Sequence, residues 1–422
     1  MKSVVLLIKK SLPALLTFLL TASSALAEPI NITISQRIID DKKSLMVLVN
    51  NQHGVLRHYF HLNTVPSGED YSFQVDRKVG EELSVTIVGL TSSHKMQWFN
   101  NVTYLGIQDN AYIDKSYDPD WEEKTTIKTT IRIHGVRSVE YFFPVSTVKP
   151  QIFDGMLNYE YSRYKKDDVF LMMKINKVNS YKCYYSSDTK QLHEFQNYQL
   201  STNYISKTLQ MPRADKWLGC IRAYYSDDNR SVPGYCHNIA KELEEVSIIN
   251  AHFPGNQDFV KYRFNLYSAN LIDQFAYYFE TTAWPNKVPE MAIEKVSFVV
   301  VEPESCKFAR PENGNFFQVH YAFETNEVEF LGAAKPASSW DIVGLFDDDT
   351  EVEVVIPQLP DDIARLYPFL DQINYPLYSK VTFFYSPELT DSNYWIEPYT
   401  VRDRNWLTNN NFQSRQHYYK FK

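Results

Sequence analysis

Four cysteines have the widest choice of chemistry in this chain, because a cysteine can bind a metal, act as a nucleophile or cross-link the fold. They are Cys183, Cys220, Cys236 and Cys306. The two nearest in sequence, Cys220 and Cys236, lie 16 positions apart, whereas zinc sites usually contain closely spaced pairs such as Cys-x-x-Cys. The spacing therefore disfavours metal ligation. A nucleophilic cysteine needs a histidine and an orienting polar group nearby, which the spacing does not reveal.

Two acidic clusters could bind calcium, a cation that takes about six to eight oxygen ligands. Asp118 and Asp120 lie in "SYDPDWEE", and Asp347, Asp348 and Asp349 lie in "LFDDDTEVE". Neither segment has the central glycine of an EF-hand loop. Acidic turns between strands are ordinary solvated features, so we expect such turns here and keep calcium binding as the alternative.

Three histidines, His53, His58 and His61, are gathered in "NQHGVLRHYFH". On one continuous strand His58 and His61 face opposite sides, so they could share a metal only across a bend. The pattern instead predicts a β-hairpin that turns at residues 50–54 and leaves the histidines as surface or edge side chains.

Five tryptophans stand beside polar or turn-forming residues and are candidate ligand contacts. An aromatic ring with such neighbours suits a sugar or protein surface, because the ring stacks while the neighbours hydrogen-bond. The alternative is that these rings close the ends of hydrophobic cores, and we favour it because large aromatic side chains are usually mostly buried. The five residues are Trp98, Trp121, Trp284, Trp340 and Trp395.

Short catalytic signatures are missing from the sequence. It contains no G-x-S-x-G, H-E-x-x-H, P-loop or G-x-G-x-x-G pattern, which disfavours the common hydrolases and nucleotide-binding enzymes that carry them. Glycosidases have no such short signature and stay open. We predict no catalytic residue and no cofactor.

The first 27 residues have the pattern of a bacterial-type secretory signal peptide. Lys2, Lys9 and Lys10 precede an apolar stretch, and "ALA" at 25–27 supplies a cleavage site. The apolar stretch is shorter than the roughly 20 residues that span a bilayer. We therefore expect a secreted or periplasmic protein with no transmembrane segment after cleavage.

In an oxidising compartment the four cysteines are expected to form disulfides, for which three pairings exist. We favour Cys183 with Cys220, since both lie in strand-like segments, which leaves Cys236 with Cys306. The alternative closes the loop between Cys220 and Cys236. Chain entropy gives about 4 kcal/mol for the first loop and about 3 kcal/mol for the second, which does not choose between them.

Charge argues against two classes of partner. The formal net charge is −8, and the signal peptide accounts for three of the lysines. Nucleic acids and anionic membranes are bound by clustered Lys and Arg, so this balance argues against both. We expect a glycan or a protein as the partner; the oligomeric state stays open.

Strict alternation of apolar and polar residues predicts β-strands. In "TTIKTTIRIHGV" the residues Ile127, Thr129, Ile131 and Ile133 alternate with polar residues, which is typical of a strand with one buried face. The segments "LSVTIVGL", "VFLMMKINKV", "FVKYRFNLY", "NFFQVHYAFE" and "TEVEVVIP" repeat the pattern. Helices are expected only in "CHNIAKELEEVS" and "PDDIARLYPFLDQI", so the alternation favours antiparallel sheets over βαβ units.

We predict a mainly β fold class made of tandem antiparallel β-sandwiches. "WLGCIRAYYSDD" resembles the cysteine-bearing strand of an immunoglobulin-like domain and supports this architecture without indicating membership of that family. The predicted units are 28–146, 147–243 and 244–422, and the alternative for the last is two domains split near 300–314. The breaks fall in "FFPVSTVKPQ" and "KELEEVSIINAHFPGN".

These features favour an exported binding or adhesion module at or outside the cell surface. The first alternative is a secreted hydrolase, acting for example on glycans, with accessory sandwiches. A cleft lined by two carboxylates would favour that enzyme. The second alternative is a structural or chaperone-like component of a surface assembly, which an exposed edge strand would favour.

Overall fold

The computed structural model describes residues 28–41, 44–93, 96–114, 126–143, 150–188, 190–214, 217–226, 230–237, 246–255, 257–268, 273–293, 299–323, 338–346, 351–361, 363, 376–386 and 412–420. Within them, β-strands dominate, which confirms the predicted mainly β class. Helix there comprises α2 (Gln36–Ile39), the 3-10 turns Leu62–Thr64 and Asn197–Gln199, and the two helical residues Asp361 and Ile363, which lie in the second predicted helix. The predicted signal peptide and most of both predicted helices lie outside this part of the chain. None of the described helices has the length and apolarity to cross a membrane.

The N-terminal core lies between two sheets. A three-stranded sheet, β4–β1–β7, faces the strands β3, β2, β5 and β6, and isoleucines and valines of both sheets form one buried cluster. The bounds are β1 (Glu28–Ile34), β2 (Ser44–Asn51), β3 (Leu56–His61), β4 (Tyr71–Arg77), β5 (Leu83–Ser93), β6 (Met96–Tyr104) and β7 (Ala111–Ile113).

The second core also draws on two sheets, β10–β11–β8–β14 and β13–β12–β9. In β8, Thr129, Ile131 and Ile133 are buried while Lys128 and Arg132 lie on the other face, as the alternation predicted. The bounds are β8 (Thr126–His134), β9 (Val139–Phe143), β10 (Gln151–Phe153), β11 (Met156–Tyr164), β12 (Val169–Ile175), β13 (Lys182–Ser186) and β14 (Leu192–Gln196).

A third core is formed by the pair β15–β18 against the strands β17, β16, β19 and β20. Phe170 and Met172 of β12 join this core, whereas Leu171 and Met173 of the same strand belong to the second core. The bounds are β15 (Tyr204–Ala214), β16 (Trp217–Tyr224), β17 (Ser231–His237), β18 (Val246–Pro254), β19 (Lys261–Ser268) and β20 (Asp273–Thr281).

The fourth core lies between the sheet β21–β22–β25 and the strands β23, β24 and β26. Met46 and Leu48 of β2 reach it from the N-terminal part of the chain, so β2 is buried on both faces. The bounds are β21 (Val299–Val301), β22 (Ser305–Ala309), β23 (Phe316–Phe323), β24 (Ser338–Leu345), β25 (Glu351–Val355), β26 (Pro376–Tyr385) and β27 (Phe412–Lys420).

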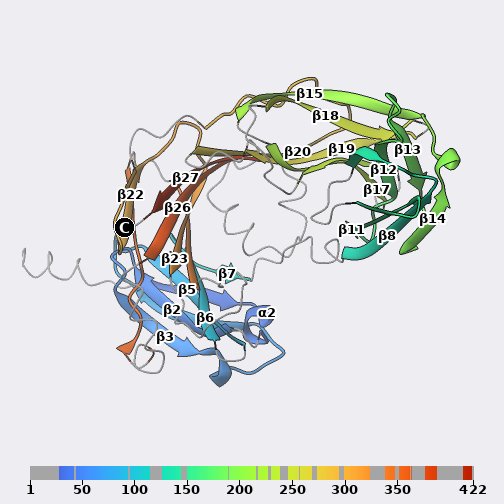
Figure 1. The fold of residues 1–422 in the computed structure, drawn as a ribbon. Coiled ribbons are helices and arrows are strands. Elements are labelled where there is room, and N and C mark those ends of the chain that lie inside the picture. The colour runs from blue at the N-terminus through green and yellow to red at the C-terminus, as the bar shows by residue number, and fades with distance from the viewer. Residues whose placement is uncertain are drawn as a thin grey trace, which may run out of the picture.

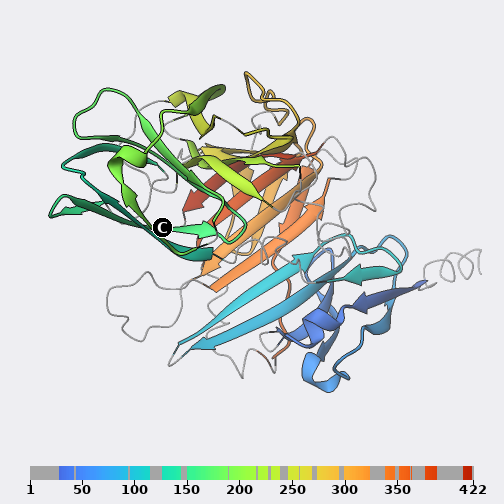
Figure 2. The same cartoon turned by 90° about the vertical axis from the view of Figure 1, so that its right-hand side faces the viewer.

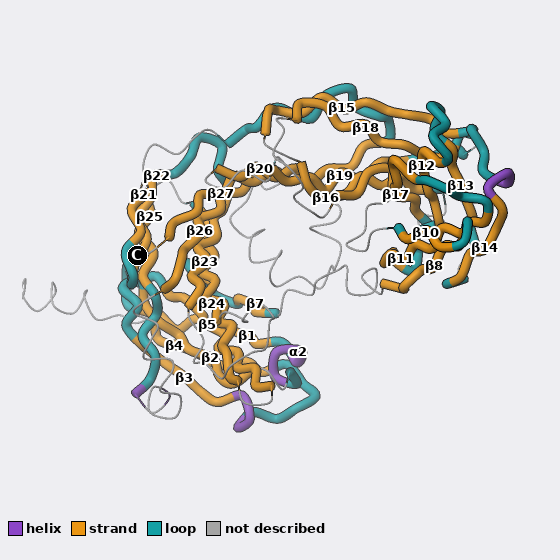
Figure 3. The backbone as a smooth tube through the Cα atoms, in the orientation of Figure 1, coloured by secondary structure: helices purple, strands orange, loops and turns teal. Residues whose placement is uncertain are grey.

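One sheet of twelve strands, in the order β17-β16-β19-β20-β27-β26-β23-β24-β6-β5-β2-β3, joins three of these cores. It bends into an arch, and β15–β18 and β21–β22–β25 lie on the outer side of the arch (Figures 1 and 3). Figure 2 shows the blue N-terminal strands continuing the orange C-terminal sheet, where β6 pairs with β24 in parallel. Strand pairs also cross both predicted breaks: β8 pairs with β11, and β15 pairs with β18.

Buried charges fix the second core to the third. The turn between β11 and β12 brings Asp168 to Arg230, whose Nη2 lies 2.8 Å from the Asp168 carboxylate, and the hydroxyl of Tyr185 donates to the same carboxylate at 2.8 Å. Next to it, Ser231 Oγ donates to Asp167 Oδ1 at 2.5 Å. Because the Asp168 side chain is 4% exposed and that of Arg230 is 41% exposed, removing Arg230 would leave a buried carboxylate without its cation, which destabilises the joint.

The cysteines correct our favoured disulfide pattern. Cys183 and Cys306 are free and buried, so neither the Cys183–Cys220 nor the Cys236–Cys306 pairing exists here. Each free thiol lies in a strand that packs it into a hydrophobic core, far from the other. Cys220 is disulfide-bonded. It stands opposite Cys236 in the register of β16 and β17, which fits the alternative pairing.

Candidate binding cleft

Most of the predicted site residues lie outside the described part of the chain. These are the calcium candidates Asp118, Asp120, Asp347, Asp348 and Asp349, and the tryptophan candidates Trp121 and Trp395. The side chain of Trp98 also lies outside the described part of the chain. Among the described residues, no group of three or more His, Cys, Asp or Glu side chains is placed to hold a metal ion.

The two described tryptophan candidates, Trp340 and Trp284, lie in hydrophobic cores, which is the alternative that we favoured over a ligand contact. Trp340 is 0% exposed, and its indole Nε1 donates to Thr103 Oγ1 at 2.8 Å. Trp284 is half-buried between aromatic rings of the third core, and its Nε1 donates to the carbonyl oxygen of Thr208 at 2.9 Å. Both indoles satisfy their polar group inside the protein, as buried tryptophans usually do.

The histidine segment forms the predicted hairpin between β2 and β3. His53 and His58 are exposed and His61 is half-buried. The ring of His58 lies 6.0 Å from that of Phe60 and 5.6 Å from that of Phe73. The histidine therefore covers aromatic rings at the flank between the edge strands β3 and β4.

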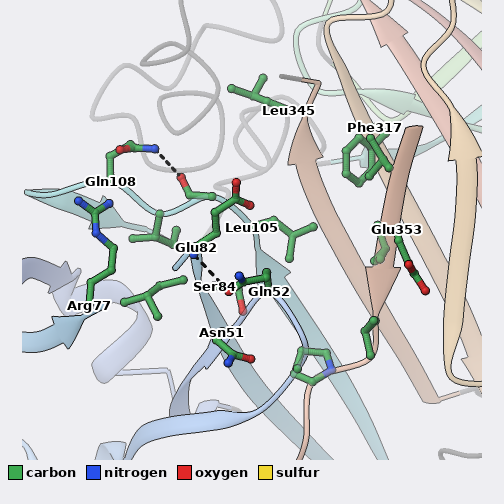
Figure 4. Close-up of a pocket in the computed structure, with 18 of the residues that line it drawn as sticks. Asn51, Gln52, Arg77, Glu82, Ser84, Leu105, Gln108, Phe317, Leu345 and Glu353 are labelled. Carbon is green, nitrogen blue, oxygen red and sulfur yellow. Dashed lines mark hydrogen bonds between the residues drawn. The ribbon is translucent and has the colours of Figure 1, made fainter. Parts of the chain in front are cut away.

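The same hairpin forms one wall of a cleft of about 230 Å³, where the N-terminal core meets the fourth core (Figure 4). The other walls come from the start of β5, the chain after β6, and β25. Polar side chains line it above an apolar floor: Asn51, Gln52, Arg77, Glu82, Gln108, Glu351 and Glu353 over Leu83, Leu105 and Phe317.

Backbone geometry holds the hairpin against the far wall. Gly54 has a φ of +74°, a left-handed conformation that glycine adopts without strain, and its carbonyl accepts the N–H of Gln358 at 2.8 Å. A Cβ at this glycine would lie 3.1 Å from the carbonyl oxygen of Ile356. Asn50 Nδ2 donates to the Gly54 carbonyl at 2.9 Å and to that of Gln358 at 3.2 Å. The cleft is therefore preformed.

Charged and amide groups enter the cleft from both sides. Figure 4 shows Arg77, Glu82 and Gln108 on one side and Glu353 with Phe317 on the other. Arg77 is paired with Glu28 at 3.0 Å. Glu353 is exposed, and its side chain makes no hydrogen bond or ion pair with any residue that the structure describes, whereas the neighbouring Glu351 pairs with Lys307. The cleft can therefore both donate and accept hydrogen bonds, and one carboxylate remains available to a ligand.

The sequence pointed to this cleft only in part. The turn at residues 50–54 and the outward glutamates of "TEVEVVIP" were predicted, but Arg77, Glu82 and Gln108 belong to three other segments. No spacing rule connects positions so far apart, so only the strand pairing brings them together.

Comparisons with known proteins give no further guide, because no family model and no curated protein matches this chain. The function must be argued from the geometry.

Proposed function

We propose that this chain is an exported binding protein that presents immunoglobulin-like β-sandwiches at or outside the cell surface and takes a glycan or protein ligand in the cleft below the β2–β3 hairpin. Its support is the combination of amide, guanidinium and carboxylate groups over an apolar floor. Ligand sites commonly combine an apolar wall with a few placed polar groups.

The polar groups suit a ligand that carries both donors and acceptors. Gln52 is held by the backbone N–H of Glu82, which donates to its Oε1 at 3.2 Å, so its amide nitrogen stays oriented. Gln108 holds its amide by donating to the Gly106 carbonyl at 3.4 Å. Hydroxyl groups of a sugar or peptide groups of a protein segment can pair with such fixed amides at little cost in side-chain entropy.

A secreted hydrolase is the second candidate, favoured by one observation. Glu82, directly before β5, and Glu353 of β25 both line the cleft, and a pair of carboxylates is what glycoside hydrolysis needs. We rank it second because Glu353 has an ordinary exposed setting, and a general acid usually requires burial to raise its pKa.

A structural role in a surface assembly is the third candidate. The long sheet ends at β3 and at β17, and an edge strand can accept a partner's strand through backbone hydrogen bonds.

The test is a glycan and protein binding screen of the purified protein, run beside a hydrolase panel. Gln108→Ala should weaken binding by about fivefold, since an uncharged hydrogen bond contributes about 1 kcal/mol. Glu160→Gln, on the distant strand β11, is the control and should bind normally. Turnover that disappears in Glu82→Gln or Glu353→Gln would instead establish the hydrolase. Binding unaffected by Gln108→Ala would place the ligand elsewhere.

A further inference from the structure

Three chemically active residues form a row across neighbouring strands of the long sheet. His320 of β23 lies directly opposite Asp341 of β24 on one side and Lys380 of β26 on the other. Adjacent strands lie about 4.8 Å apart, so the two charged residues flank the imidazole and are separated from each other by about 10 Å.

Asp341 orients the imidazole. Its Oδ1 lies 2.8 Å from His320 Nδ1 and accepts a second hydrogen bond, also 2.8 Å, from Gln318 Nε2. A carboxylate on Nδ1 favours the tautomer with the proton on that nitrogen. The Nε2 atom is then left as a hydrogen-bond acceptor, and it has no partner among the described residues.

Lys380 is held in place without being neutralised. Its Nζ lies 5.5 Å from the ring centroid of Tyr378, and the ring of Tyr378 lies 6.0 Å from that of His320. A ring face attracts an ammonium group through its quadrupole but carries no net charge. Lys380 makes no ion pair with any carboxylate in the described part of the chain. A positioned cation therefore stands beside a positioned acceptor.

The row lies on the inner face of the arch. Phe317, Val319 and Tyr321 point from β23 into the fourth core, toward β21–β22–β25 on the outside. Figures 1 and 3 show β22 on the outer side of β23 and β26. Because successive side chains of a strand point to opposite faces, the alternate residues of β23 must point to the inside of the arch. The side chains of His320 and Asp341 are 25% and 24% exposed, which leaves both accessible.

We propose that this row binds a hydroxy-carboxylate of the kind that acidic sugars carry. The carboxylate pairs with Lys380, and a neighbouring hydroxyl donates to His320 Nε2. This inference rests on the proposed binding function and names a ligand class for it, at a second surface of the same molecule.

The surroundings favour a sugar with a single carboxylate over a polyanion. The net charge of −8 repels long anionic polymers, whereas one carboxylate matches one unpaired lysine. Thr382 and Phe384 lie on the same face of β26 as Lys380. A hydroxyl group and an aromatic ring therefore lie next to the ammonium group along the strand. A sugar ring offers hydroxyl edges and an apolar C–H face, which suit that sequence of side chains.

The experiment compares D-glucuronic acid with D-glucose, which lacks the carboxylate, by isothermal titration of the purified protein. We expect glucuronic acid to bind at least about tenfold more tightly, because charge-assisted hydrogen bonds are stronger than neutral ones. Lys380→Gln should abolish the preference and Lys380→Arg should retain it. Lys128→Gln, an exposed lysine of β8 paired with Glu160, is the control.

Equal affinity for the two sugars, or an unchanged preference in Lys380→Gln, overturns the site. Equally tight binding of a glutamate-containing peptide overturns the assignment to sugars. Failure of this site can be distinguished from failure of the proposed function. If Gln108→Ala weakens binding of a cleft ligand and Lys380→Gln does not, the proposed function stands without this second site. His320→Phe should weaken glucuronic acid and glucose alike, since it removes the hydroxyl acceptor and not the cation; a loss confined to glucuronic acid contradicts that role.

Discussion

Replacing Trp340 tests whether this tryptophan is a core residue or a ligand contact. The side chain is completely buried in the fourth core, and its Nε1–H donates to Thr103, whose hydroxyl also pairs with that of Thr86 at 2.8 Å. Trp340→Ala should therefore act through stability, and Trp340→Phe should act in the same direction with a smaller effect.

The magnitude follows from the packing. Truncating a buried tryptophan to alanine costs about 3–5 kcal/mol of unfolding free energy. Phenylalanine keeps most of the ring contact but loses the hydrogen bond and leaves a small void, so about 2 kcal/mol is expected. Thr103 retains Thr86 as a partner, so no further penalty for an unpaired hydroxyl arises. At about 2–4 °C per kcal/mol, Trp340→Ala lowers Tm by about 6–20 °C.

Differential scanning calorimetry measures the shift, with Tyr198→Ala as the control because that tyrosine is 77% exposed. The control should change Tm by less than about 2 °C, as surface substitutions usually cost under 0.5 kcal/mol. An unchanged Tm in Trp340→Ala, together with lost ligand binding, would show that the indole faces a ligand and would refute its assignment to the core.

Three more outcomes follow from the structure. Cys183 and Cys306 should resist a thiol reagent in the native protein, because burial raises the pKa of both thiols, that of Cys306 to about 12. In denaturant without reductant, two thiols per chain should react with the reagent. Four reactive thiols would contradict the disulfide at Cys220. Gly54→Ala should lower stability by about 1–2 kcal/mol in chemical denaturation, because the added Cβ meets both a positive φ and a close carbonyl; no change would mean that the hairpin is not clamped. Asp168→Asn should cost about 1–3 kcal/mol through the lost charge-assisted bonds to Arg230, measured by thermal unfolding against Asp188→Asn, and equal losses in the two variants would argue against a buried joint.

Local pattern was enough to predict the strands. The alternation in "TTIKTTIRIHGV" and "NFFQVHYAFE" predicts the buried face of β8 and of β23, because the period of a strand is two residues. Phe316 and Ala322, on the other face of β23, are buried as well, which the alternation did not predict. The hairpin turn at residues 50–54 was predictable for the same reason, since "NNQHG" interrupts two apolar runs.

The disulfide was not predictable in this way. Strand-like surroundings are common to Cys183 and Cys220, but only the pairing of β16 with β17 places Cys236 opposite Cys220. A long-range pair is decided by which strands become neighbours, and sequence spacing carries little information about that.

The same limit explains why the binding surfaces were missed. Lys380 and Asp341 reach His320 only because β26 and β24 both pair with β23, and the cleft needs β6 beside β24, which joins segments far apart in the chain. Taken alone, each polar residue is predicted to be an ordinary solvent-facing residue of an alternating strand. Chemistry appears only when neighbouring strands align these polar halves into rows across the sheet.

Two strands are each shared by two cores. "SLMVLV" and the first half of "VFLMMKINKV" are apolar at consecutive positions, so the strict alternation that we predicted for the second segment is wrong there. Strands of this kind are typical of sheets covered on both faces. In the structure β2 sends Val47 to the N-terminal core and Leu48 to the fourth, while β12 sends Leu171 to the second core and Phe170 to the third. Because each of these strands is shared by two cores, loosening one core removes support from a wall of the next. Destabilisation of the fourth core, for example by Trp340→Ala, should therefore weaken ligand binding at the cleft more than an equal loss of stability in the second core, which does not line it.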